Sequence, residues 1–251
     1  IGVRLVGSEM CIRDRFFTPL ENKMYSNMTK SFEDFHEDLR LFCDENNIKK
    51  DKINIVGVSK KKSLEDILSL YKLGLRDFGE NYAQELNEKS LALNSEKIRW
   101  HFMGPIQSNK IGLIVKNSYL VHSVDREKVV RKMDLESKKI DKRQKILVQV
   151  NISGEVSKSG ISPSDVEEFV NFVDNFANLE LAGLMFMPNI NQDKALHIKE
   201  INDSVKLFND LRTKKKNIKI LSLGTSSDYK ECIKEGSNLI RVGEILFGPR
   251  L

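Results

Sequence analysis

The chain has 251 residues, of which 40% are hydrophobic and 31% charged, a composition typical of a soluble globular protein with one large or two small domains. No run reaches the roughly 18–20 apolar residues that a membrane-spanning helix needs, which argues against a membrane protein. The net charge of +5 comes from interleaved basic and acidic residues, as in Lys128–Lys139, and no basic stripe with aromatic residues predicts nucleic-acid binding.

The cysteine and histidine spacing gives no sign of a disulfide framework or a zinc site. Cys11, Cys43 and Cys232 lie far apart without a CxxC pair, and the four histidines form no HxxxH pair. We therefore expect a cytoplasmic protein without a structural metal.

The first residues do not read as part of a fold. Ile1–Arg15 mixes charges with a short apolar start and lacks the apolar run of a signal peptide. We interpret residues 1–23 as a non-native leader or read-through without ordered structure. Met24 or Met28 is then the expected start, and residues 24–251 form the expected domain.

Beyond the leader, helical and strand-like segments alternate. An opening helix is expected near Lys30–Asn46, and the apolar, β-branched segment Ile53–Ser59 predicts a buried strand. Ser63 and Asp66 predict a capped helix start, and Gly74 predicts its end. A later helix is expected to start at Ser162–Pro163. The remaining predicted strands are Leu75–Phe78, Arg99–Met103, Tyr119–Ser123, Lys145–Ile152, Leu179–Met187, Ile218–Leu223 and Leu239–Val242.

This alternation predicts one α/β domain with a parallel sheet. Eight strand–helix units in about 200 residues favour a single closed (β/α)₈ TIM barrel over an open doubly wound sheet. No GxGxxG follows the first strand and no GxxxxGK[ST] occurs, which argues against dinucleotide-binding and P-loop folds.

Lys60 directly follows the first predicted strand. In a parallel barrel, functional residues gather at the carboxyl ends of the strands, where a partly desolvated lysine becomes a usable amine nucleophile. The alternative is that Lys60 is only the first of three lysines in a solvated turn.

Small and hydroxyl-bearing residues follow the seventh strand in Gly224–Asp228 (GTSSD), a composition suited to phosphate binding. Arg241 and Gly243 end the eighth strand, and the loops after strands seven and eight usually form the phosphate site of such barrels. The alternative is that Ser226 or Ser227 merely caps the helix that ends at Gly236. A phosphate site together with an aldehyde-reactive lysine suits pyridoxal 5′-phosphate, while a sugar phosphate bound to a lysine imine, as in aldolases, is the competing chemistry.

Several long segments closely resemble the YggS/PROSC family of pyridoxal phosphate homeostasis proteins. They are VGVSK (56–60), FGENYAQEL (78–86), WHFMGPIQSNK (100–110), VHSVDR (121–126), VQVNISGEVSKSGI (148–161), GLMFMP (183–188) and LSLGTSSDYKECIKEGSNLIRVGEILFGPR (221–250). The resemblance implies a fold-type-III barrel, similar to the N-terminal domain of alanine racemase.

By position, the resemblance implies an internal aldimine on Lys60 and a cofactor phosphate held by the GTSSD loop and the end of the eighth strand. It also places a residue near the cofactor ring, two residues in the pocket wall, and a secondary contact of weaker support. The resemblance assigns the phosphate to Gly224, Thr225, Ser226 and Gly243, and the contact with the ring to Arg241. It assigns the pocket wall to Asn81 and Met187, and the secondary contact to Lys158. Thr225, where the family often has methionine, and Leu246, in place of isoleucine, depart from the family pattern.

The leading functional hypothesis is a protein that buffers or delivers pyridoxal phosphate without efficient turnover, acting as a monomer, with pyridoxal phosphate-dependent apo-enzymes as recipients. An arginine at the ring nitrogen makes the ring a poorer electron sink, and racemases of this fold take a second acid/base from an additional domain, which we do not expect after Leu251. The alternative is an amino-acid racemase or decarboxylase that uses Tyr82 or His101 as its base. A third hypothesis, a nucleic-acid or protein scaffold, predicts no role for Lys60.

Overall fold

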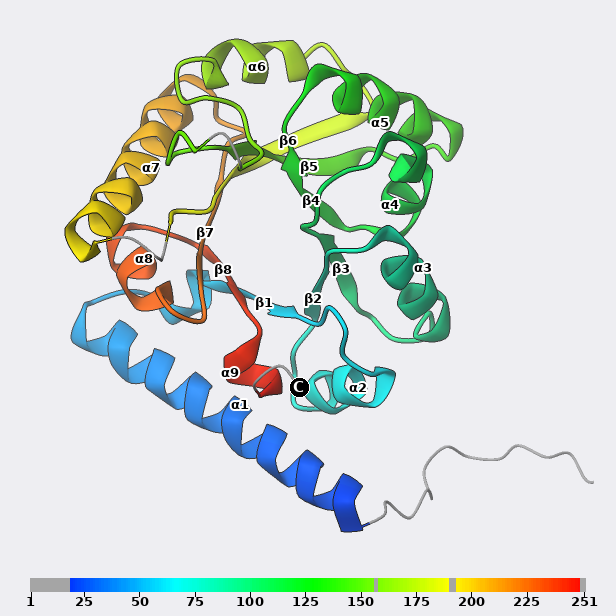
Figure 1. The fold of residues 1–251 in the computed structure, drawn as a ribbon, viewed down its shortest axis with the longest axis vertical. Helices are drawn as coiled ribbons and strands as arrows, with labels where there is room; N and C mark the ends of the chain where they lie inside the picture. Colours follow the sequence, from blue (N-terminus) through cyan, green and yellow to red (C-terminus); the bar gives the residue numbers. More distant parts are fainter. Residues whose placement is uncertain (1–18, 156–157, 190–192, 249–251) are drawn as a thin grey trace, which may run out of the picture.

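A computed structural model describes residues 19–155, 158–189 and 193–248 of the chain. Eight parallel strands form a closed barrel in which each strand pairs with the next and β8 pairs with β1, which confirms the predicted (β/α)₈ barrel. Figure 1 looks into this barrel, with the helices placed around its outside. The strands are β1 (Asn54–Val58), β2 (Asp77–Glu80), β3 (Arg99–Phe102), β4 (Leu120–Val124), β5 (Gln144–Val150), β6 (Leu179–Phe186), β7 (Ile220–Thr225) and β8 (Leu239–Val242).

Every predicted strand overlaps an observed one, and the helices follow the strands in the expected alternation. Two strands, β2 and β7, begin two residues later than predicted. Strand β2 begins at Asp77 instead of Leu75, because the Leu75 N–H still bonds to the Leu70 carbonyl at the preceding helix end. The helices are α1 (Pro19–Glu45), α2 (Leu64–Lys72), α3 (Ala83–Ala92), α4 (Ile111–Asn117), α5 (Glu127–Lys139), α6 (Val166–Val173), α7 (Lys194–Lys214), α8 (Tyr229–Glu235) and α9 (Glu244–Phe247), with 3₁₀ turns at Lys50–Lys52 and Ser108–Lys110.

Helix α2 begins as its sequence predicts. The Ser63 hydroxyl accepts a hydrogen bond from the Asp66 N–H at 3.1 Å, and the Asp66 carboxylate accepts one from the Ser63 N–H at 3.2 Å. These reciprocal bonds satisfy two N–H groups that the first helical turn would otherwise leave without partners. Gly74 follows the helix with a positive φ of 110°, as expected for a C′ glycine.

The start of helix α6 differs from the expectation. The helix begins at Val166, and the segment from Ser162 forms a turn in which the Asp165 N–H bonds to the Ser162 carbonyl at 3.0 Å. The Ser164 hydroxyl bonds to the Asp165 carboxylate at 2.9 Å. Such local side-chain bonds offer the backbone an alternative to helix, which is the physical reason for the later start.

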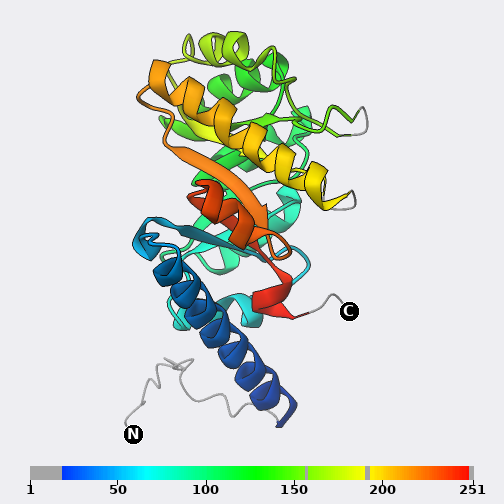
Figure 2. The ribbon, with the colours of Figure 1, turned by 90° about the vertical axis from the view of Figure 1, so that its left-hand side faces the viewer.

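Helix α1 lies along the outside of the barrel, next to α2 and α9 (Figures 1 and 2). It starts at Pro19, eleven residues before the expected Lys30, and proline is tolerated in a first turn because the N–H there needs no helical partner. The helix therefore includes residues 19–23 of the predicted leader, while residues 1–18 lie outside the described residues.

The barrel separates two apolar cores. The larger one lies between the strands and the surrounding helices, and the smaller one consists of buried residues in the barrel interior. Because side chains alternate along a strand, every second residue points inward. The smaller core comprises Val56, Leu120, Leu147, Ala182, Met185 and Leu239.

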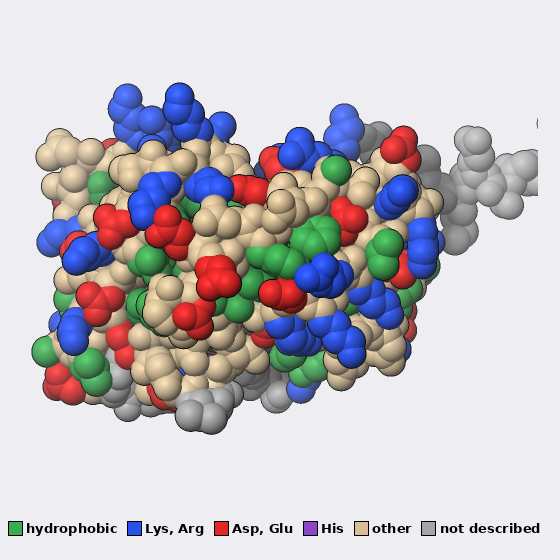
Figure 3. Space-filling model, turned by 90° about the horizontal axis from the view of Figure 1, so that it is seen from above, with side chains coloured by type: hydrophobic (Ala, Val, Ile, Leu, Met, Phe, Trp, Pro, Cys, Tyr) green, Lys and Arg blue, Asp and Glu red, His purple; other side chains and the backbone are tan. Residues whose placement is uncertain are grey.

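The visible surface carries mixed charge. Figure 3 shows basic and acidic side chains interspersed over one face of the molecule, as the interleaved sequence predicts. None of the described helices combines the length and the apolar character needed to cross a membrane. Within the described part of the chain, no group of three or more His, Cys, Asp and Glu side chains could hold a metal ion.

Candidate functional site

A pocket of about 910 Å³ opens at the carboxyl ends of the strands. Of the predicted site residues, all but Gly224 line it: Lys60, Asn81, Lys158, Met187, Thr225, Ser226, Arg241 and Gly243. These residues come from both ends of the chain and meet only because the barrel closes. Further polar lining residues, which the sequence did not single out as site residues, are Asp125, Gln149, Asn151, Ser159, Ser227 and Glu244.

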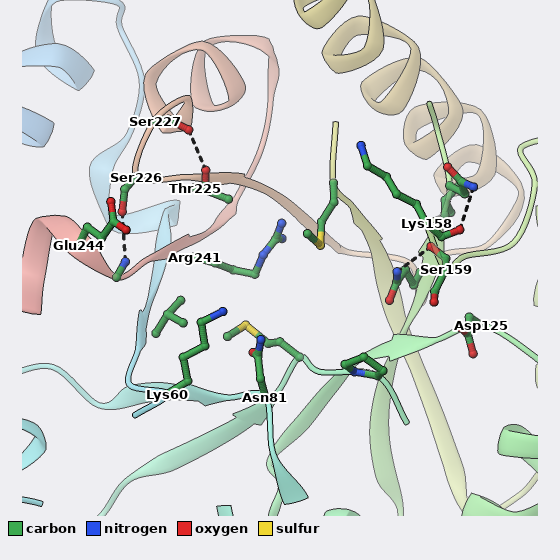
Figure 4. Close-up of a pocket in the computed structure, with 18 of the residues that line it drawn as sticks. Lys60, Asn81, Asp125, Lys158, Ser159, Thr225, Ser226, Ser227, Arg241 and Glu244 are labelled. Carbon is green, nitrogen blue, oxygen red and sulfur yellow. Dashed lines mark hydrogen bonds between the residues drawn. The ribbon is translucent and has the colours of Figure 1, made fainter. Parts of the chain in front are cut away.

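Lys60 leaves strand β1 through a tight turn that fixes its position. The Lys62 N–H bonds to the Ser59 carbonyl at 3.0 Å, and Lys61 adopts a left-handed conformation with φ of 60°. The Lys61 N–H is held at 2.6 Å by the carboxylate of Glu85 on α3. A non-glycine residue at positive φ is uncommon, so the turn depends on these contacts to keep Lys60 at the pocket wall (Figure 4).

A buried ion cluster supports this turn from behind. The ammonium of Lys89 on α3 lies 2.9 Å from the Glu80 carboxylate, 2.7 Å from that of Glu85 and 2.7 Å from the Ser59 carbonyl. The Ser59 hydroxyl donates to Glu80 at 2.6 Å. Burial raises the pKa of the Glu80 carboxyl above its usual range, against the opposing effect of Lys89. Nothing around Lys89, one lysine among many, predicts that its side chain is buried.

The GTSSD loop after β7 is organised by Asp228. One carboxylate oxygen accepts the Thr225 N–H at 2.7 Å and the Thr225 hydroxyl at 2.9 Å. Asp228 is also the N-cap residue of α8, so neither Ser226 nor Ser227 caps that helix, and the capping alternative is wrong. The Thr225 N–H thus bonds to Asp228, while Thr225 itself lines the pocket.

The serines of the loop remain as donors. Within the described residues, neither the Ser226 N–H nor the Ser227 N–H makes a hydrogen bond. The Ser226 hydroxyl accepts the Gly243 N–H at 3.2 Å, which joins the loops after β7 and β8. Two unpaired amides beside a pocket are a suitable anion site.

Helix α7 supports the same loop through His197, a residue without a predicted role in the site. Its Nε2 lies 3.3 Å from the second carboxylate oxygen of Asp228, and its Nδ1 lies 3.1 Å from the Asn189 carbonyl. Both neighbours are hydrogen-bond acceptors, and each ring nitrogen of His197 faces one of them. His197 therefore ties the β6–α7 segment to the loop after β7.

Arg241 lies in the barrel interior with its guanidinium at the pocket floor (Figure 4). It donates to the Ser222 hydroxyl at 2.6 Å and to the Phe186 carbonyl at 2.9 Å. Burial lowers its pKa to about 10, and Asp228 opposes that effect. The site thus presents a fixed cation between Lys60 and the loop after β7.

Lys158, Ser159 and Asp125 lie across the pocket from Lys60 (Figure 4). The amide of Asn151 donates to the backbone carbonyls of Glu155 at 2.8 Å and Lys158 at 3.0 Å, which holds this loop at the pocket. The Lys158 ammonium lies 3.2 Å from the Glu155 carboxylate. Burial raises the pKa of Asp125 despite the adjacent Arg126.

The two residues proposed as alternative bases do not line this pocket. Tyr82 is 51% exposed at the start of α3, and His101 is buried in the barrel interior, where it contacts His122 and Asp77. Gly224 also lies outside the pocket wall; its φ of 106° lets the loop turn over α8. The hypothesis of a racemase or decarboxylase that uses Tyr82 or His101 therefore loses its proposed bases.

Comparisons with known proteins identify the family. The model of the alanine racemase N-terminal domain matches residues 48–250. A pyridoxal phosphate homeostasis protein of Vibrio alginolyticus is 36% identical over 202 residues, which are 79% of this chain and 87% of the relative. That of Pseudomonas aeruginosa is 37% identical over 198 residues, 79% of this chain and 85% of the relative. The chain belongs to the pyridoxal phosphate homeostasis protein family.

Solved structures agree with this family on the fold. An unknown protein from Bifidobacterium adolescentis superposes with a TM-score of 0.85 at 22% identity, covering 93% of this chain and 98% of the other. PipY of Synechococcus elongatus with PLP bound gives 0.77 at 24% identity, covering 88% and 100%. A Clostridium difficile alanine racemase gives 0.66 at 19% identity, covering 85% of this chain and 57% of the racemase. These three solved structures share the barrel seen here.

Proposed function

We propose that this chain binds pyridoxal 5′-phosphate and takes part in its homeostasis, holding the cofactor for buffering or delivery. The observation that carries the proposal is that Lys60, Arg241 and the unpaired amides of the loop after β7 face one pocket. A lysine amine can react with an aldehyde, and two neighbouring backbone N–H groups without partners can bind a phosphate. Relatives at 36–37% identity are pyridoxal phosphate homeostasis proteins, which supports this ligand.

The residues present fit the chemical groups of this cofactor. The Lys60 nitrogen would bond to the aldehyde carbon with loss of water. The Ser226 and Ser227 amides would hold the phosphate in the space beside Gly243, whose own N–H bonds to the Ser226 hydroxyl. Arg241 would lie against the ring. When bound, the cofactor supplies an electron-withdrawing ring that stabilises negative charge on an attached carbon.

Arg241 favours a carrier over an efficient enzyme. A guanidinium is only a donor and keeps its protons, so it leaves a ring nitrogen beside it unprotonated. The ring then withdraws electrons weakly. We propose that the protein has no efficient turnover, works as a monomer in the cytoplasm, and passes the cofactor to apo-enzymes. Lys158, across the pocket, is proposed as a secondary contact, and Asn81 and Met187 as walls.

Two assays on the loaded protein test this function. Incubation with a panel of L- and D-amino acids should give no more than one product molecule per protein, whereas repeated turnover would establish an enzyme. Mixing with a pyridoxal phosphate-dependent apo-enzyme should restore that enzyme's activity as the carrier loses its visible band. Failure to bind the cofactor at all would contradict the proposal.

A further inference from the structure

A continuous line of hydrogen-bonding side chains runs through the barrel interior, starting at Arg241 in the pocket. Arg241 contacts Ser222 at 2.6 Å, and Ser222 Oγ lies 3.1 Å from His122 Nδ1. His122 Nε2 lies 2.9 Å from His101 Nδ1, and His101 Nε2 lies 2.9 Å from Asp77 Oδ1. Asp77 starts β2, so the line ends at the amino ends of the strands, opposite the pocket.

The two ends of this line determine its direction. An ionised carboxylate only accepts, so His101 donates from Nε2, and a neutral His101 then accepts at Nδ1. His122 must therefore donate from Nε2 and accept at Nδ1 from the Ser222 hydroxyl. The Ser222 oxygen is left to accept from Arg241, which can only donate. With both imidazoles neutral, every link points from Arg241 to Asp77.

The surroundings favour this state of the line. His122 and Ser222 are fully buried, and burial is the main cause that lowers the pKa of His122 well below its usual value, so this ring is neutral. At the far end burial raises the pKa of Asp77, but hydrogen bonds from Arg99 and His101 outweigh it and keep the carboxyl ionised. A cation and an anion thus lie at the two ends of the line, with the neutral His122 between them.

We propose that Asp77, through His101, His122 and Ser222, positions Arg241 and strengthens its hold on the bound cofactor. This inference rests on the proposed function, in which Arg241 lies against the pyridoxal ring. Hydrogen bonds that share a direction polarise one another, so the Asp77 charge makes the Ser222 oxygen a better acceptor for the guanidinium. Asp77, His101, His122 and Ser222 are positioning residues that do not touch the cofactor.

A double-mutant cycle on the full chain tests the coupling. The Kd of pyridoxal phosphate and the absorption maximum of the bound form are measured for wild type, Asp77→Asn, Ser222→Ala and the double variant. Asp77→Asn should weaken binding about fivefold, because asparagine keeps the shape but loses the charge. With Ser222→Ala already present, Asp77→Asn should cause no further change, because the line is cut.

Arg99→Gln is the matched control. The Arg99 Nε donates at 2.7 Å to Asp77 Oδ1, the oxygen that also contacts His101, but the Arg99 side chain is half exposed and lies outside the line. Water can take its place beside a carboxyl that stays ionised at neutral pH, so this change should leave cofactor affinity within about twofold of wild type. Equal effects of Arg99→Gln and Asp77→Asn, or independent effects of Asp77→Asn and Ser222→Ala, would overturn the inference while leaving the proposed function intact. Absence of binding by wild type would overturn the proposed function itself.

Imidazole ¹⁵N NMR of the cofactor-free protein gives a second test that depends on no cofactor. His101 and His122 should both carry their proton on Nε2, with Nδ1 unprotonated. A proton on Nδ1 of either ring at neutral pH would overturn the inference, because the line would then reverse direction between Arg241 and Asp77.

Discussion

The Ser226 hydroxyl accepts a hydrogen bond from the Gly243 N–H at 3.2 Å, and this contact joins the two loops that form the proposed phosphate site. A Cβ built at Gly243 would lie 3.4 Å from the Val58 Cβ, an ordinary contact. The protein itself thus has room for a side chain there. The space in front of Gly243 belongs to the pocket.

Gly243→Ala should therefore separate folding from cofactor binding. Its φ of −120° suits any residue, so the free energy of unfolding should change by less than about 1 kcal/mol. The added methyl group would occupy space proposed for the phosphate and weaken pyridoxal phosphate about tenfold or more. Denaturant unfolding and a fluorescence titration measure the two effects. Pyridoxal, which lacks the phosphate, is the control ligand, and an equal loss for both ligands would contradict the phosphate assignment.

His197→Phe should loosen the same site from a distance. The change removes both donors of the imidazole, so Asp228 loses one partner and holds Thr225 less firmly. We expect about three- to tenfold weaker binding of pyridoxal phosphate, since one hydrogen bond to the Asp228 carboxylate is lost. Pyridoxal should bind as before. Unchanged affinity for both ligands would show that the β6–α7 segment does not support the loop.

His122 should make the protein less stable in mild acid. In the unfolded chain this histidine takes up a proton near its ordinary pKa of 6.5, while burial lowers its pKa in the folded state. The stability it contributes is therefore present above pH 6.5 and lost as the pH falls below that value. His122→Gln should flatten the pH dependence of the free energy of unfolding by up to about 1.4 kcal/mol per pH unit between pH 6 and 5. Parallel curves for the two proteins would contradict this.

Lys89→Met should destabilise the protein by about 3–5 kcal/mol, because it leaves the buried Glu80 carboxylate without its cation. Adding Glu80→Gln should recover much of that loss, since the fully buried charge is then gone and the remaining carboxylate, Glu85, is partly exposed to water. Denaturant unfolding of the single and double variants measures both steps. A double variant that is less stable than Lys89→Met alone would contradict the ion-pair account.

The fold could be predicted because local patterns and global topology agree. The strand from Ile53 and the helix from Ser63 each carry their own signal, and eight such units suffice for a barrel. The predicted strand ends likewise placed Lys60 and Arg241 at the carboxyl ends of the strands, where the pocket lies. Local signals failed at Ser162, where serine hydroxyls form a turn in place of the first helical turn.

Contacts between distant segments could not be predicted. His197 lies on α7 and Asp228 caps α8, and no local pattern around either residue predicts that they meet. The line from Arg241 to Asp77 joins residues that are far apart along the chain, and only the inward alternation of closed strands aligns them. Lys89 resembles any exposed lysine until α3 packs against β2.

The most direct test of the central claim is the visible spectrum of the protein with pyridoxal phosphate, before and after borohydride reduction. Wild type should show a band at about 420 nm from a protonated lysine imine, and the reduced adduct should map to Lys60. Lys60→Ala should lose the band, while Lys158→Ala, which removes the lysine across the pocket, should keep it. A wild-type protein without the band, or a band that survives Lys60→Ala with the adduct elsewhere, would contradict the account.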